Sequence, residues 1–392
     1  IKANEVIMRV LSLFDGMACG MLAMKSAGVN VESYDAYEID KYAIKVANHN
    51  FPSIAQHGDV FEADFAQYEG VDWLIGGSPC TYWSIAQTKN RETIASGIGW
   101  ELFQQYVRAL HEAKPKFFIY ENNKSMSKDI RASIEEAFGF EAICINSALV
   151  SAQNRQRLYW AGKRNAKGTY DKVDVGKPQD RGILLKDVLE TNTNGTRYIL
   201  DSVKSLSERE IDYMFRKEGR TDYGYIQNTN RDKTQCITAN ISKGVPYNCL
   251  FEEVTEPIRV GTIKNKLQNK AHYSKQYRVY SSDGKSTTLC GQGGGVGAKT
   301  GLYATPVTSI QHNAYEVKDG MITIENKQHP VKLADGFYII RKLTVHECMR
   351  LQTVPEWYDF SCISNSQAYK CLGNGWTVEV IAHLIREALK SE

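Results

Sequence analysis

Short apolar runs alternate with helix-favouring stretches along the first 125 residues. The first run, Arg9 to Leu13, is followed by Gly16 and Gly20 and then by residues typical of a helix. Further apolar runs cover 34–40, 57–60, 71–75 and 116–120, and a long helical pattern covers 100–113. Strands and helices that alternate at this spacing predict a doubly wound α/β sheet.

Small or polar residues fall at the carboxyl ends of these predicted strands, namely Gly16, Glu38, Asp59, Cys80 and Glu121. Ligands of doubly wound sheets bind beyond the carboxyl ends of the strands. Gly16 would let the backbone approach a ligand, and an acid after the second strand is placed to accept hydrogen bonds from ribose hydroxyls. We therefore expect a nucleoside-containing cofactor. The chain has neither G-x-G-x-x-G nor a Walker lysine pattern, which argues against a dinucleotide dehydrogenase and a P-loop NTPase.

The alternation stops after Arg157 and does not resume before Arg341, which predicts a separate inserted domain of short strands and turns. Charge is concentrated there. The whole chain has a formal net charge of +3, whereas 257–315 holds eight Lys or Arg and one acid, a local net of +7. Interleaved tyrosines make this stretch similar to a nucleic-acid surface, although a charge run by itself is more often a solvated face.

Cys80 follows a predicted strand and Pro79, so its thiol should lie on a tight turn. A single cysteine in such a place is usually buried and inert. Here Glu121 follows the next strand, and Arg155 and Arg157 stand at alternate positions of an extended segment, hence on one face. Arginines near a thiol favour its thiolate and can also hold a phosphate. Cys80 is therefore our candidate nucleophile.

These motifs resemble, in order and over nearly the whole chain, those of the C5-cytosine DNA methyltransferases. The matching segments are Phe14-Asp15-Gly16, Glu38, Asp59-Val60, Ser78-Pro79-Cys80, Glu121-Asn122-Asn123, Gln153-x-Arg155-x-Arg157, 341–355 and Gly373-Asn374-Gly375-Trp376. Asn123 replaces the usual Val, which we expect to matter little. The first loop and the Gly-Trp pair are closer to the animal de novo branch, while 153–157 is of the bacterial and phage kind.

The resemblance implies a Rossmann-like, S-adenosylmethionine-dependent methyltransferase domain at 1–164 and 365–392. A smaller, mostly β and irregular target-recognition domain is expected at 165–364. Cys80 would attack C6 of a flipped cytosine, Glu121 would hold the base edge, and Arg155 and Arg157 would fix the base and its phosphate. C5 would then take the methyl group, leaving S-adenosylhomocysteine as the product.

The same resemblance assigns the binding residues. Cofactor contacts are expected from Phe14, Asp15, Gly16, Glu38, Ile39, Asp59, Val60, Pro79, Asn374, Gly375 and Trp376. DNA contacts are expected from Ser84, Lys89, Arg91, Gln153, Lys275, Arg278, Thr288 and Leu289. Residues 85–99 are similar to the mobile loop that closes over the flipped base. No metal site is expected, because the nine cysteines lack metal-ligand spacing.

Three functions remain open at this point. The first is a sequence-specific DNA methyltransferase of a phage or a bacterial restriction-modification system, the second a transfer RNA cytosine-5 methyltransferase, and the third a catalytically silent DNA-binding relative. The basic insert favours duplex DNA, and the presence of Cys80, Glu121, Arg155 and Arg157 argues against the silent relative. We expect a monomeric, nucleoid-associated enzyme of the cytoplasm of a bacterial host cell, with double-stranded DNA and, in a restriction system, a cognate endonuclease as partners, and no membrane contact.

Overall fold

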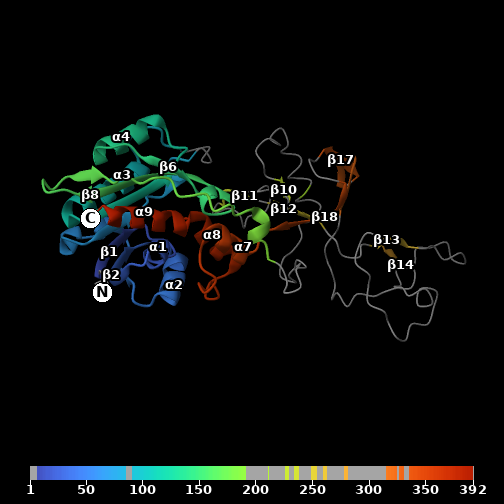
Figure 1. The fold of residues 1–392 in the computed structure, drawn as a ribbon, viewed down its shortest axis with the longest axis horizontal. Helices are drawn as coiled ribbons and strands as arrows, with labels where there is room; N and C mark the ends of the chain where they lie inside the picture. The colour runs from blue at the N-terminus through green and yellow to red at the C-terminus, as the bar shows by residue number, and fades with distance from the viewer. Residues whose placement is uncertain are drawn as a thin grey trace, which may run out of the picture. The chain divides into compact units, whose positions relative to one another are not determined.

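The computed structural model describes residues 7–84, 91–190, 315–324, 326–330 and 335–391, with short pieces between 211 and 280. The chain divides into two compact units (Figure 1). The first comprises 1–195, 230–247 and 344–392, and the second comprises 196–229 and 248–343. The segment 344–364, which we expected in the target-recognition domain, thus belongs with the first unit, because Gln352 is buried there and bonds Gln153.

In the described part of the first unit, eight strands form one sheet. Its order is β3 (Ala55–Gln56), β2 (Asn30–Tyr37), β1 (Ile7–Leu13), β4 (Trp73–Gly76), β5 (Phe117–Asn123), β8 (Gln156–Arg164) and β6 (Ile143–Asn146), and β9 (Tyr170–Lys172) pairs with β8. The strands from β3 to β5 are parallel, and β8 runs antiparallel to both β5 and β6. This is the predicted α/β sheet with an antiparallel strand that the sequence pattern did not reveal.

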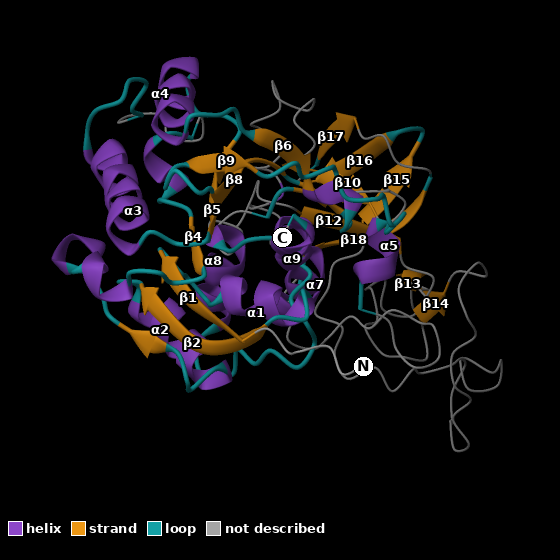
Figure 2. Cartoon of the chain, turned by 60° about the vertical axis from the view of Figure 1, so that its left-hand side comes forward, coloured by secondary structure: helices purple, strands orange, loops and turns teal. Residues whose placement is uncertain are grey.

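Helices cover both faces of this sheet (Figure 2). On one face lie α3 (Ile98–Ala113) and α4 (Lys128–Phe138), and on the other lie α1 (Cys19–Ser26) and α9 (Val378–Lys390). Strands covered on both sides read as continuous apolar runs, as Trp73, Leu74 and Ile75 do in β4, each fully buried. The remaining helices are α2 (Lys41–Asn50), α5 (Leu185–Val188), α7 (Val345–Leu351) and α8 (Asn365–Asn374), and the short 3₁₀ helices are η1 (Val60–Glu62), η2 (Phe65–Tyr68), η3 (Cys80–Tyr82) and η4 (Ser147–Leu149).

Local capping explains where several helices begin. The carboxylate of Asp40 accepts from the amide of Tyr42 at the start of α2, and Thr344 and Glu347 form a capping box at the start of α7. Asp59 caps η1 in the same way, with its Oδ1 3.0 Å from the amide nitrogen of Phe61. The predicted third strand at 57–60 is therefore wrong in position: the strand is β3, two residues long, and 60–62 turn into a 3₁₀ helix.

The described residues of the second unit lie mostly in β-strands. Its described strands form a sheet ordered β10 (Ile226–Asn228), β12 (Cys249–Glu253), β18 (Gly336–Lys342), β15 (Tyr315–Lys318), β16 (Met321–Ile324) and β17 (Lys327–Pro330), and β13 (Arg259–Thr262) pairs with β14 (Arg278–Tyr280). Strand β11 (Thr234–Gln235) instead pairs with β7 (Gln153–Asn154) inside the first unit. Within the described residues, none of the helices combines the length and the apolar character of a membrane span.

Candidate active site

A cavity of about 260 Å³ lies at the carboxyl ends of the central parallel strands. It brings together most of the residues that the sequence singled out. They are Phe14, Asp15, Gly16, Glu38, Pro79, Cys80, Glu121, Arg155, Arg157, Asn374, Gly375 and Trp376. Three expected cofactor contacts, Ile39, Asp59 and Val60, are not among its lining residues, and of these Ile39 is 74% exposed.

The end of β5 holds the loop that carries Cys80. The amide nitrogen of the Asn122 side chain donates to the carbonyl oxygen of Ser78 at 3.1 Å, and that of Asn123 donates to the carbonyl oxygen of Cys80 at 3.4 Å. The hydroxyls of Ser78 and Tyr120 lie 2.6 Å apart in the core. Asn123, which we expected to matter little, is therefore one of the groups that fix the backbone of Cys80.

Cys80 begins η3 and reaches solvent, yet the cavity walls still exclude much of the water around its sulfur. This burial raises the pKa of the Cys80 thiol; Arg157 lowers it, and Glu121 raises it further. The net direction is upward, so the protonated thiol is favoured in this arrangement. Our expectation that the arginines would favour the thiolate is thus outweighed by desolvation and by the neighbouring carboxylate.

Glu121 lies in the last part of β5, because this strand extends through Asn123. Its Oε1 is 3.1 Å from Nε of Arg157, and both side chains are largely buried, with exposed fractions of 12% and 16%. Its Oε2 accepts a hydrogen bond from Nε1 of Trp376 at 3.0 Å. A Cβ at Gly77 would lie 2.7 Å from the carbonyl oxygen of Glu121 and 3.0 Å from Oε2, so only glycine leaves room for this carboxylate.

Arg155 is 4% exposed, and its guanidinium is directed at the protein backbone. It donates to the carbonyl oxygens of Ile237 at 2.8 Å, Gly373 at 3.3 Å and Gly375 at 2.9 Å. A buried guanidinium with several carbonyl partners is an anchor for the chain segments that carry those carbonyls. The structure thus makes Arg155 the support of the segment ending in Trp376, and leaves Arg157 as the arginine beside the thiol and Glu121.

Gln153 is fully buried, which rules out the DNA contact expected of it in this arrangement. Its Nε2 donates to the carbonyl oxygen of Leu351 at 3.0 Å and to Oε1 of Gln352 at 3.1 Å, and its Oε1 accepts from the amide of Ile237 at 2.6 Å. These bonds tie β7 to residues of the first unit that lie between and after the two segments of the second unit. Its role here is to hold the first unit together.

The other end of the cavity is acidic. Oε2 of Glu38 accepts from the amide of Gly16 at 2.8 Å, and Oε1 accepts from the amides of Ile39 and Asp40, each at 2.8 Å. Gly16 has a φ of +62°, which glycine adopts without strain. A carboxylate offers about four acceptor positions, so Glu38 keeps acceptor capacity for a further hydroxyl.

Asp15 is the most unusual group at this end. Its Oδ1 accepts from the hydroxyls of Ser12 and Tyr34, each at 2.6 Å, whereas Oδ2 is buried and has no partner among the described residues. Burial raises the pKa of the Asp15 carboxyl to about 6; the two hydroxyls lower it and Glu38 raises it. An orphaned buried oxygen in the wall of a cavity indicates a place for a donor group of a ligand.

Two further contacts, one beside the cavity and one in its lining, were missed in the sequence. Cys236 lies 3.2 Å from Nη1 of Arg155; burial raises the pKa of its thiol, but the charges of Arg155 and Arg157 outweigh this and lower it. Lys370 pairs with Asp40 at 2.6 Å at the acidic end of the cavity. Both contacts join residues at least 81 positions apart, so a local sequence pattern could not predict them.

A family model of C-5 cytosine-specific DNA methylases matches residues 8–390, which is almost the whole chain. The chain belongs to the C-5 cytosine-specific DNA methylase family. The enzyme class expected from the motifs, an S-adenosylmethionine-dependent C5 cytosine DNA methyltransferase, is thereby confirmed.

Several relatives of this methylase chain come from Bacillus phages. It is 30% identical over 323 residues to the orphan methyltransferase M.Rho11sI of Bacillus phage rho11s, a match that spans 76% of this chain and 60% of that protein. It is 28% identical to the orphan methyltransferase M.SPRI of Bacillus phage SPR, across 97% of both chains. The S. pombe Dnmt2 methyltransferase superposes with a TM-score of 0.57 at 15% identity, across 98% of this chain and 99% of that one, which shows a shared fold. Because both phage relatives are named orphan methyltransferases, the cognate endonuclease we expected as a partner finds no support.

The residues of this methylase chain expected to contact DNA are only partly described. Ser84 is half-buried, and its amide donates to the carbonyl oxygen of Cys80 at 3.0 Å. The guanidinium of Arg91 donates to the carbonyl oxygens of Trp83 at 3.2 Å and Ser125 at 2.7 Å, so it anchors one end of the loop after Cys80. Of Arg278 only the backbone, in β14, is described. The predictions for Lys89, Lys275, Thr288 and Leu289 lie outside the described residues.

Proposed function

We propose that this chain methylates C5 of a cytosine flipped out of duplex DNA, with Cys80 as the nucleophile. The observation that carries the proposal is the cavity itself. Cys80, Glu121 and Arg157 line it together with the Phe14-Asp15-Gly16 loop and Glu38. A covalent catalyst and a nucleoside site thus share one enclosed space, which is the arrangement that methyl transfer to a weakly nucleophilic carbon requires.

The cofactor end fits S-adenosylmethionine. Glu38 has acceptor capacity for the ribose hydroxyls, and the unpartnered Oδ2 of Asp15 suits a positively charged or donating group such as the ammonium of the methionine part. Asn374, Gly375 and Trp376 would close this end, with Ile39, Asp59 and Val60 as outer contacts of the adenine. When bound, the cofactor supplies an electrophilic methyl group on a sulfonium.

The residues at the other end would activate the base. C5 of cytosine is too weak a nucleophile to attack a sulfonium directly, so the Cys80 thiol first loses its proton to solvent and its sulfur forms a bond to C6. As the sulfur bonds to C6, N3 takes up a proton from solvent, which it returns on elimination. Glu121 accepts hydrogen bonds from N3–H and the exocyclic amine, and Arg157 stabilises the charge that develops on the base. The electron-rich C5 then takes the methyl group. Loss of the C5 proton and elimination of the Cys80 sulfur restore the aromatic base and the free enzyme.

A stacked base cannot enter this cavity, so the target nucleotide must leave the helix. Unstacking costs a few kcal/mol, which protein contacts must supply. We propose that Ser84, Lys89 and Arg91 and the loop that they span contribute these contacts. Lys275, Arg278, Thr288 and Leu289 would contribute them from the inserted domain.

The preference for DNA over RNA rests on the sequence of the insert. Its local net charge of +7 over 257–315, with interleaved tyrosines, suits a phosphate backbone. The family description also names DNA. The first alternative is a transfer RNA cytosine-5 methyltransferase, and the second alternative is a catalytically silent DNA-binding relative.

Labelled methyl transfer separates these possibilities. The full chain is incubated with labelled S-adenosylmethionine and either duplex DNA or transfer RNA, alongside Cys80→Ala and Cys362→Ala. Cys362 serves as a matched control because it is a free cysteine outside the cavity lining. We expect label on DNA for the wild type and Cys362→Ala, and none for Cys80→Ala. Label on transfer RNA alone, no label at all, or full activity of Cys80→Ala would contradict the proposal.

A further inference from the structure

Trp376 and Glu121 are joined by a hydrogen bond that connects the two ends of the cavity. The indole Nε1 donates to Oε2 of Glu121 at 3.0 Å, although the residues are 255 positions apart. The ring of Trp376 belongs to the segment that would close the cofactor end, whereas Glu121 belongs to the end that would receive the base. The two functions assigned to this cavity thus share one contact.

The backbone before Trp376 is held from three sides. Arg155 donates to the carbonyl oxygens of Gly373 and Gly375, and Nε2 of Gln352 donates to that of Gly375 at 3.1 Å. The amide of Gly375 donates to the carbonyl oxygen of Cys371 at 2.8 Å. A Cβ at Gly375 would lie 3.0 Å from that same oxygen, so the segment is packed tightly. The position of the indole is therefore well defined before any ligand binds.

The carboxylate of Glu121 needs this second contact. Arg157 forms an ion pair with Oε1, with its Nε at 3.1 Å. One contact leaves the carboxylate plane free to rotate about its last side-chain bond, where the torsional preference is broad. A donor on Oε2 fixes the plane, and each oxygen still retains acceptor capacity for the N3 and amine hydrogens of a base.

We propose that Trp376 is a positioning residue for Glu121, which means that its indole N–H orients the carboxylate that receives the target base. The inference rests on the proposed function, because it assumes that Glu121 engages the base. This positioning role is distinct from a contact with the cofactor, which the indole ring could make without its N–H. Preorganised hydrogen-bond acceptors act on the reaction because they need no reorientation as charge develops.

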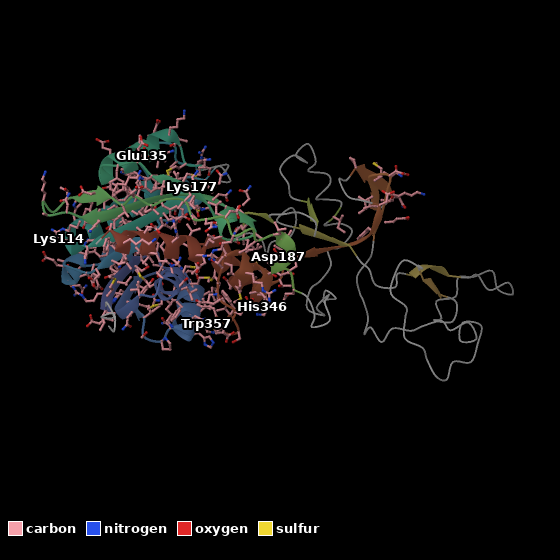
Figure 3. The ribbon with its side chains drawn as sticks, viewed as in Figure 1. Lys114, Glu135, Lys177, Asp187, His346 and Trp357 are labelled. Carbon is pink, nitrogen blue, oxygen red and sulfur yellow. The ribbon has the colours of Figure 1, made fainter. Side chains whose placement is uncertain are left out.

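Exchange of the C5 hydrogen tests this without methyl transfer. If Cys80 adds to C6, C5 can take a proton from water, lose its original hydrogen to water and then release Cys80, so that tritium at C5 is replaced by hydrogen with no net change. The rate of tritium release from duplex DNA with [5-³H]cytosine is measured without cofactor, together with binding of S-adenosylhomocysteine. The proteins are the wild type, Trp376→Phe, Glu121→Asp and the double variant. Trp357→Phe is the matched control, since Trp357 is 55% exposed and lies outside the cavity lining (Figure 3).

We expect Trp376→Phe to release tritium roughly ten-fold more slowly, the effect of a lost hydrogen bond to a charged group. Its binding of S-adenosylhomocysteine should stay within about two-fold of the wild type, because the aromatic ring is retained. In the Glu121→Asp background, whose carboxylate is withdrawn by one methylene, Trp376→Phe should have little further effect.

Two results would overturn the inference while leaving the proposed function standing. One is wild-type tritium release by Trp376→Phe, with or without weaker binding of S-adenosylhomocysteine. The other is a ten-fold loss that is fully additive with Glu121→Asp, since additivity would mean that the indole does not act through this carboxylate. No tritium release by the wild type would contradict the proposed function itself, and the inference with it.

Discussion

Asp15→Asn tests the electrostatics of the cofactor end without any ligand. The Asp15 carboxyl is buried, and burial raises its pKa from the ordinary 3.8 to about 6. At 1.36 kcal/mol per pKa unit, this rise opposes the ionised form by about 3 kcal/mol. Because the folded protein binds this proton more tightly than the unfolded chain, the group's contribution to the free energy of unfolding falls as the pH rises from about 4 to about 6, and stays reduced above that.

Asparagine keeps an oxygen for the hydroxyls of Ser12 and Tyr34 but cannot ionise. The measurement is urea unfolding of both proteins at a series of pH values from 5 to 7.5, a window that contains about half of the 3 kcal/mol. The free energy of unfolding of Asp15→Asn minus that of the wild type should increase by about 1.5 kcal/mol from pH 5 to pH 7.5. A difference that does not change with pH would refute the reasoning, whatever its absolute size, because a merely steric effect of the substitution does not titrate.

Three further predictions follow from the site geometry. The rate at which iodoacetamide alkylates Cys80, followed by peptide mapping, should rise with pH over a range that lies above the range for a free cysteine, because the pKa of the Cys80 thiol is raised; a rate that levels off below neutral pH would contradict this. Arg155→Lys should lower the free energy of urea unfolding by about 3 kcal/mol, because a lysine cannot serve the carbonyls of Ile237, Gly373 and Gly375 together, and an unchanged value would show that these bonds are dispensable. Gly77→Ala should lower the free energy of unfolding by about 1–3 kcal/mol through the 2.7 Å approach of its Cβ to the carbonyl oxygen of Glu121, and an unchanged value would mean that the close approach costs nothing; Gly139→Ala, where space is free but φ is +80°, is a comparison for backbone strain alone.

The parallel half of the sheet could be predicted from the sequence because each buried strand is a short apolar run that ends in a recognisable turn. Leu74 and Ile75 before Gly76-Gly77 illustrate this. The antiparallel strand β8 was not anticipated, although Arg155 and Arg157 were correctly placed on one face. Strand direction depends on the pairing of β8 with β5, which runs from Asn123–Arg157 to Phe117–Lys163, so the partners lie 34 to 46 positions apart and leave no local signature.

In the candidate site, too, some features could be predicted from the sequence and others depend on the packing of distant segments. Residues carried by strand ends, such as Cys80 and Glu121, were found because parallel strands bring their carboxyl ends together. Roles that depend on the direction of a side chain could not be predicted from the sequence. Gln153 was predicted to contact DNA and Arg155 to fix the target base and its phosphate, but burial directs their amide and guanidinium groups to backbone carbonyls of distant segments. The orphaned oxygen of Asp15 likewise arises from packing, since its neighbours Ser12 and Tyr34 both bind the other oxygen.

Covalent trapping on a fluorinated substrate tests the central claim most directly. Fluorine at C5 cannot leave as a cation, so after methyl transfer the bond between Cys80 and C6 of a 5-fluorocytosine would persist. The full chain is incubated with S-adenosylmethionine and a duplex that contains 5-fluorocytosine, and the adduct is digested and mapped by mass spectrometry. We predict a methylated fluorocytosine adduct on the peptide that contains Cys80, and none with Cys80→Ala. An adduct on Cys236 or on another residue, or no adduct in a preparation that methylates ordinary DNA, would contradict the account.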